Sequence, residues 1–72
     1  MRKRNVVIST LSEDVFTNTI DKLEELGVCI IEKRYDLLYH RYEIYARATL
    51  RQSYVLRHFM KNLDGTIVDF GS

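Results

Sequence analysis

The chain has 72 residues, 46% of them apolar and 29% charged, with a formal net charge of +1. This length allows a single domain with a small core, for which stabilisation by a partner subunit is expected, and the composition excludes a disordered tail. No apolar run approaches the ~20 residues that span a membrane, and the basic start Arg2-Lys3-Arg4 precedes an apolar stretch too short for a secretion signal.

The first predicted elements are a short strand and an amphipathic helix. The β-branched residues in 5–9 predict the strand. Thr10 and the glutamate three residues later match a capping box, which makes Thr10 the expected N-cap, with Ser12 as a competing candidate. The helix is expected to end near Leu26, and Gly27 then takes the left-handed conformation that terminates helices. Its buried stripe is expected to consist of Phe16, Ile20, Leu23 and either Leu26 or Gly27.

Residues 28–35 are predicted to form the second strand. The run Val28-Cys29-Ile30-Ile31 is apolar at successive positions, which favours a strand covered on both faces and therefore an inner position in a sheet. Cys29, the only cysteine, is then expected to be a small buried side chain and not a reactive thiol. A single cysteine fits a reducing, cytoplasmic compartment.

The next segment predicts a hairpin. Residues 36–40 contain neither glycine nor proline, so we expect a wide loop and not a two-residue turn. Residues 42–50 alternate, which predicts a third strand with one face in the core and the other open to solvent or to a partner. The core face is expected to contain Tyr42, Ile44, Ala46, Ala48 and Leu50, and the open face Glu43, Tyr45, Arg47 and Thr49.

The last elements repeat the order of helix, glycine and strand. Ser53 is the expected N-cap of the second helix, Gly65 is expected to end it, and residues 66–70 predict the last strand. The segment 56–68 thereby repeats the organisation of 23–31. The side chains that the second helix is expected to bury are Val55, Leu56, Phe59, Met60 and Leu63.

The element order βαββαβ predicts an α+β fold, the ferredoxin-like sandwich, with residues 1–72 as one domain. The expected spatial strand order is 4-1-3-2, and right-handed crossovers place both helices on one face of an antiparallel sheet. We interpret residues 1–4 as a basic leading segment that is flexible or lies beside a membrane.

The sequence contains no constellation of residues for catalysis. His40 and His58 have no serine, cysteine or carboxylate at a spacing that indicates a triad, and with Cys29 they do not form a zinc pattern. The three glycines are isolated, which argues against a phosphate-binding loop. We therefore expect a non-enzymatic protein without a metal or cofactor.

Four residues are candidates for an interface. Tyr35, Tyr45, Arg47 and Val7 are expected to share the open face of the sheet, and tyrosine and arginine are enriched at interaction hot spots. The sequence thus predicts a regulatory or oligomerisation module that forms a homodimer, through this face or through the sheet edges.

Two alternative functions stay open. The basic segment 33–61 favours a nucleic-acid-binding module. On the third strand, however, only Tyr45 beside Arg47 is expected to point outward, and the first strand has no aromatic residue, which disfavours base stacking. Thr10 and Ser12 lie in the turn after the first strand and are candidates for binding a small metabolite, whose identity the sequence does not indicate.

Three segments carry a resemblance to a known family. Leu26-Gly27-Val28-x-Ile30 after the first helix, the polar hairpin, and the short strand after Leu63-Asp64-Gly65 resemble an ACT-like domain over nearly the whole chain. ACT domains that bind amino acids usually have an Asp-x-x-Gly-type turn between the first strand and helix. The corresponding segment 9–13 has no glycine, so the resemblance does not extend to that ligand site.

The layout is also similar to the cytoplasmic C-terminal domain of MgtC/SapB-type membrane proteins. This resemblance implies a parent membrane protein that continues upstream of Met1, with Arg2-Lys3-Arg4 on the cytoplasmic side of a membrane segment.

Overall fold

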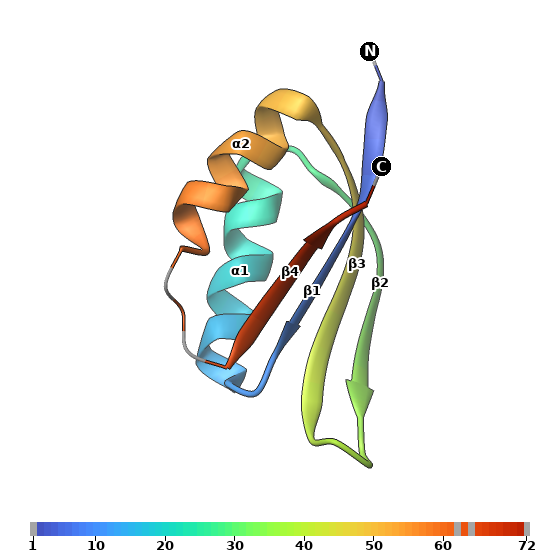
Figure 1. Cartoon of the computed structure of the whole chain (residues 1–72), viewed down its shortest axis with the longest axis vertical. Helices are drawn as coiled ribbons and strands as arrows, with labels where there is room; N and C mark the ends of the chain where they lie inside the picture. The colour runs from blue at the N-terminus through green and yellow to red at the C-terminus, as the bar shows by residue number, and fades with distance from the viewer. Residues whose placement is uncertain (1, 62, 64, 72) are drawn as a thin grey trace.

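A four-stranded sheet carries two helices on one of its faces (Figure 1). The structure, a computed structural model, describes residues 2–61, 63 and 65–71. The strands are hydrogen-bonded in the order β2-β3-β1-β4, and all neighbours are antiparallel. This arrangement confirms the predicted α+β, ferredoxin-like fold and its strand order. The elements are β1 (Lys3–Thr10), α1 (Glu13–Glu25), β2 (Cys29–Asp36), β3 (Arg41–Thr49), α2 (Leu50–Phe59) and β4 (Thr66–Phe70).

The core lies between the helices and the two central strands. Val6 and Ile8 of β1 pair with Ala46 and Ile44 of β3, and all four side chains point toward the helices and are buried. Strict alternation along both strands places these residues on one face, as predicted for β3. The buried apolar side chains are Val6, Ile8, Leu23, Val28, Ile44, Ala46, Ala48, Leu56 and Met60.

Each helix contributes few fully buried residues. Leu23 of α1 and Leu56 of α2 are inaccessible to solvent, whereas Phe59, predicted to be buried, is 38% exposed. Thr19 is also completely buried and was not anticipated from the sequence. Its Oγ1 donates a hydrogen bond to the Met60 sulfur at 3.5 Å, which satisfies the hydroxyl and links the two helices.

The N-cap of α1 is Ser12 and not Thr10. Ser12 Oγ accepts a hydrogen bond from the backbone N–H of Val15 at 3.2 Å. Thr10 is the last residue of β1, where it pairs with Tyr42 and Thr66, so its backbone is committed to the sheet. Its hydroxyl instead accepts from the backbone N–H of Ser12.

Helix α2 begins earlier than predicted. Thr49 and Gln52 form a complete capping box, and this pair replaces Ser53 as the start signal. Leu50, predicted to be the last core-facing residue of the strand, is therefore the first residue of the helix and is 68% exposed. Ser53 becomes an interior helical residue facing the core.

The two glycines that close the repeated pattern differ in their roles. Gly27 has φ +74° and follows the C-cap residue Leu26, as predicted. Helix α2 ends at Phe59, and Gly65, with φ +68°, stands directly before β4 instead of terminating the helix. Asp64, which lies between Phe59 and Gly65 in the sequence, is outside the described residues.

Strand β2 is an edge strand, contrary to the prediction of an inner one. A β-bulge lies between Ile30, which pairs with Ala46, and Glu32, which pairs with Tyr45. Ile31 is the extra residue and is 58% exposed. The apolar run at the start of β2 therefore reflects a bulge and not a strand covered on both sides.

Ser53 provides a test of this packing. Its Oγ is buried and has no hydrogen-bond partner among the described residues. We expect Ser53→Ala to raise the free energy of unfolding by about 1 kcal/mol, because the substitution removes an unsatisfied polar group and favours helix. Urea denaturation followed by circular dichroism measures this change. Ser12→Ala, which removes a working N-cap, should lower the free energy of unfolding by about 1 kcal/mol. If Ser53→Ala lowered it as well, this would contradict the conclusion that the Ser53 hydroxyl is buried without a partner.

Candidate functional site

The face of the sheet opposite the helices has no covering element in Figure 1. On it, Val7 of β1 pairs with Tyr45 of β3, and Asn5 pairs with Arg47. Three of the four predicted interface residues are therefore brought together on adjacent central strands. We call this surface the open face. By strand register and, for Ile31, by the lining of the hollow described below, the central part of the open face comprises Asn5, Val7, Ser9, Cys29, Ile31, Glu32, Arg34, Glu43, Tyr45, Arg47, Ile67 and Asp69.

Tyr35, the fourth candidate, does not belong to the open face. It pairs with Tyr42, and the two ring centroids are 4.8 Å apart. Tyr42 in turn lies 5.0 Å from the ring of Phe16 in α1, so Tyr35 is on the helix side. The bulge at Ile31 is the cause: without the extra residue, alternation from Ile30 would turn Tyr35 toward the open face.

The packing of Tyr42 on the helix side changes the pKa of its hydroxyl. Burial raises the pKa of Tyr42 above its usual value, and the nearby carboxylate of Glu13 raises it further. The neutral form is therefore favoured in the folded protein.

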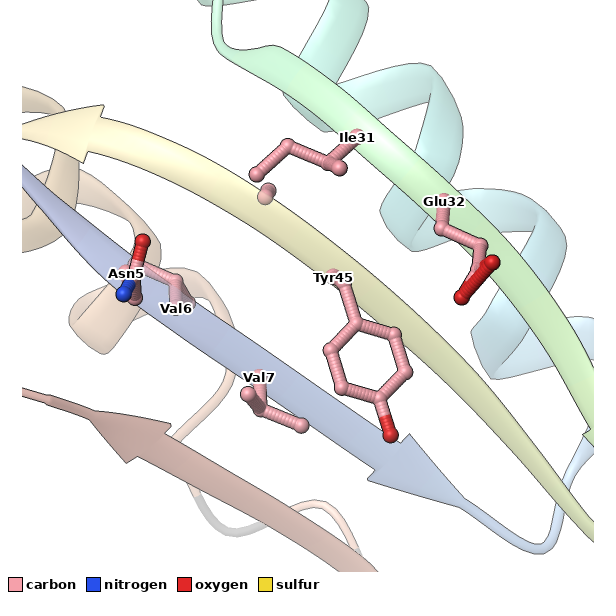
Figure 2. A pocket seen from close by; sticks show the side chains of 7 residues that line it. Asn5, Val6, Val7, Ile31, Glu32 and Tyr45 are labelled. Carbon is pink, nitrogen blue, oxygen red and sulfur yellow. The ribbon is translucent and has the colours of Figure 1, made fainter.

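Apolar side chains form a shallow hollow at the centre of the open face. Figure 2 shows the Tyr45 ring beside Val7, with Ile31 projecting from β2 on the same side. The hollow has a volume of about 380 Å³. Ile67 of β4, opposite Ser9, is 63% exposed and extends the apolar surface toward the other edge. An antiparallel sheet with one solvated face usually carries polar residues there, so these four side chains depart from that pattern.

Charged groups of both signs surround the hollow. The Arg34 guanidinium lies 5.7 Å from the centre of the Tyr45 ring, and its Nε is 3.4 Å from a Glu32 carboxylate oxygen. The hydrogen bond to the Tyr45 side chain, and less strongly the charge of Glu32, raise the pKa of Arg34 above its usual value. The Tyr45 hydroxyl also donates to Glu43 at 3.5 Å. Tyr45 is thereby held in place from two sides.

Arg41 fixes one end of the open face. Its Nε donates to Ser9 Oγ at 2.6 Å, and its Nη2 donates to the carbonyl oxygens of Ser9 and Gly65 at 3.1 and 3.0 Å. One guanidinium thus joins β3, β1 and the turn before β4. Sequence reasoning assigned Arg41 only to a basic segment, because no local pattern indicates a contact with residues so distant in the chain.

Cys29 lies on the open face opposite Arg47 and is exposed. The prediction of a buried thiol is therefore wrong. The alternation of β2 before the bulge turns Ile30 toward the helices and Cys29 away from them.

The two candidates for a metabolite site are used within the fold. Thr10 Oγ1 bonds to Thr66 Oγ1 at 2.9 Å and accepts from the Ser12 backbone, while Ser12 caps α1. His40 Nδ1 is 3.2 Å from the Tyr35 hydroxyl, and His58 lies 4.8 Å from the ring of Tyr54 on the surface of α2. Within residues 2–61, 63 and 65–71, no three His, Cys, Asp or Glu side chains gather to hold a metal ion.

Helices of the described part of the chain are too short or too polar to cross a membrane.

Comparison with known proteins gives one fold relationship. An uncharacterized protein from Thermotoga maritima has a similar structure, with a TM-score of 0.59, 13% sequence identity, and 94% of each chain covered. At this identity the similarity shows a shared fold alone. No protein-family model matches the chain, and no curated protein matches it.

Because Cys29 is exposed, we expect its thiol to be reactive in the folded protein. At low micromolar protein concentration, without denaturant, Cys29 should react stoichiometrically with a disulfide reagent, at a rate within about tenfold of that in the unfolded chain. Absorbance of the released thiolate measures both rates. A thiol that reacts only after urea is added would show that this part of the open face is covered.

Proposed function

We propose that this chain is a non-enzymatic regulatory module of ACT-like type, and that its open face binds a second copy to form a homodimer. The observation that carries the proposal is the apolar centre of the open face, formed by Val7, Ile31, Tyr45 and Ile67. Apolar side chains that form a continuous surface on a sheet are typical of a protein contact, whereas scattered ones are not.

The amount of exposed surface supports association. A compact monomer of 8.6 kDa is expected to expose about 4,700 Å². This chain exposes 5153 Å². The difference is of the size that one partner contributes to a small interface, and a domain with few fully buried residues benefits from covering it.

The charges of the open face favour a second copy as the partner. Arg34 and Arg47 lie on the same surface as Glu32, Glu43 and Asp69. In a two-fold contact a surface meets itself, so a face of one sign would repel its copy, whereas a mixed face can align each arginine with an acid.

The alternative functions have weaker support. The described basic side chains of 33–61 do not line one surface. Arg34 and Arg47 are on the open face, where Arg34 pairs with Glu32, whereas Arg51 and Arg57 are on α2 and Arg41 is bound to Ser9 and Gly65. A nucleic-acid site would need a continuous basic surface. The hydroxyls proposed for a metabolite site already have partners in the fold.

The test combines two substitutions on the open face. Tyr45→Ala with Arg47→Glu removes the central ring and reverses one charge, so the dissociation constant of the dimer should rise about 30-fold or more, the effect of losing a hot spot. Sedimentation equilibrium over a concentration series measures it, with circular dichroism to verify the fold. Dimerisation should also slow the alkylation of Cys29 as protein concentration rises.

The chain offers a matched control on α2. Tyr54→Ala with Arg51→Glu changes the same residue types at exposed positions of the helical side, and it should leave the dissociation constant unchanged. A wild-type protein that stays monomeric at millimolar concentration refutes the proposal. So does a control variant that dissociates as readily as the open-face variant. Salt-dependent binding of single-stranded RNA by a monomer would instead favour the nucleic-acid alternative.

A further inference from the structure

A groove runs between α1 and α2, because each helix packs on the sheet more than on the other helix. Figure 1 shows both helices on the side of the sheet away from the open face. One part of the groove is an apolar hollow of about 130 Å³, to which Val15, Phe59 and Leu63 contribute. Phe59 is 38% exposed in it. A space of this size holds one aliphatic side chain, since an apolar cavity of about 150 Å³ holds benzene.

Acidic side chains form the rim of the groove along α1. Asp14, Asn18, Asp21 and Glu25 are exposed and recur at helical spacing, so they form one stripe on the helix surface. At about 1.5 Å per residue the stripe is roughly 17 Å long, or three turns. In α1 as a whole, five acids oppose the single base Lys22, which gives the helix a net charge of −4 in a chain of net charge +1.

Lys22 shows which chemistry the groove accepts. Next to the apolar hollow, Asp21, Lys22 and Glu25 line a second hollow of about 330 Å³ that shares Phe59 with the first. The Lys22 Nζ lies 5.6 Å from the centre of the Phe59 ring and 3.3 Å from Glu25 Oε1. The ring and the carboxylate thus hold one ammonium group through a cation–π contact and an ion pair. Among the described residues, Asp14 and Asp21 form no ion pair, so their charges are open to a further cation.

We propose that this groove binds a basic amphipathic helix of a partner protein. An apolar side chain of the partner enters the hollow beside Phe59, while lysines or arginines one turn away along the partner helix reach Asp21 and Glu25. The negative rim selects the partner, because it repels nucleic acid and anionic lipid and attracts a basic protein segment. A small polyamine would pair with the carboxylates but would leave the apolar hollow unfilled. The groove lies on the helical side, so the proposal does not depend on self-association through the open face.

A synthetic helix provides the probe. A fluorescein-labelled peptide of about 14 residues, with leucines on one face and lysines on the other, is nearly four turns long and covers the stripe. Titration with the protein, followed by fluorescence anisotropy, measures the dissociation constant. We expect saturable binding that weakens as salt is added. A peptide with glutamates in place of the lysines should not bind.

Two variants separate the charged contacts from the apolar one. Asp21→Asn with Glu25→Gln should raise the dissociation constant about fivefold, because two charged contacts are lost. Phe59→Ala should raise it about tenfold by removing the anchor of the groove, with circular dichroism to verify the fold. The matched control is Glu32→Gln with Asp69→Asn, which makes the same change of net charge on the open face. Charges more than about 8 Å apart are screened at physiological salt, so the control should stay within about twofold of wild type.

Lys22 gives a prediction of the opposite sign. Its ammonium group occupies the position that a cation of the partner takes between Glu25 and the Phe59 ring. Lys22→Gln removes this internal competitor, so it should lower the dissociation constant about threefold. A lysine that serves only to stabilise the fold would give no such gain in affinity.

Four results would overturn the proposal. The first is the absence of saturable peptide binding at millimolar protein concentration. The second is an equal rise of the dissociation constant in Asp21→Asn with Glu25→Gln and in the open-face control, which would mean that net charge alone attracts the peptide. The third is displacement of the peptide by spermine at an equal concentration, which would make the groove a polyamine site.

The fourth result is a change in sedimentation of the Asp21→Asn, Glu25→Gln protein without peptide, which would make the groove a contact between copies. The open-face variant Tyr45→Ala with Arg47→Glu keeps the groove intact and should bind the peptide like the wild type. The test of the open face contains no peptide, so the two proposals fail independently.

Discussion

Two helices cover only one side of a four-stranded sheet, and this constraint determines where the chain can act. Alternation along β1 and β3 buries Val6, Ile8 and Ile44 beneath the helices and necessarily turns Val7 and Tyr45 the other way. A sheet of this kind is stable with its second face in water when that face is polar. Here the centre of the second face is apolar, so the same alternation that builds the core also builds a surface that gains by being covered.

One inserted residue shapes most of the asymmetry between the two faces. The bulge at Ile31 sends that side chain into the hollow beside Tyr45 and turns Tyr35 to the helix side, where its ring contacts that of Tyr42. A bulge also bends and twists an edge strand, which makes it a poorer template for pairing with another chain. The long edge of β2 is thus the less favourable route to a dimer, and the open face is the more favourable one.

The sequence predicted what depends on periodicity and missed what depends on competition between local signals. The fold and the strand order follow from chain order, and the shared face of Val7, Tyr45 and Arg47 follows from alternation along β1 and β3, whose pairing contains no bulge. The start of α2 was decided between Ser53 and the capping box of Thr49, two signals of similar strength. The exposure of Cys29 and the position of Tyr35 depended on a bulge, for which the apolar run around Ile31 gave a misleading signal.

The charged side chains around Tyr45 fit the proposed contact with a second copy. The open face mixes both signs around Tyr45, as a surface must if it is to meet its own copy. Behind the hairpin tip the charges are also mixed, because Arg34 pairs with Glu43 across the hairpin and Asp36 accepts hydrogen bonds from the backbone of the loop. Arg41, at the loop end of the hairpin, joins β3 to the central sheet through its bonds to Ser9 and Gly65. A dimer formed through the open face would therefore present two hairpins in a fixed orientation.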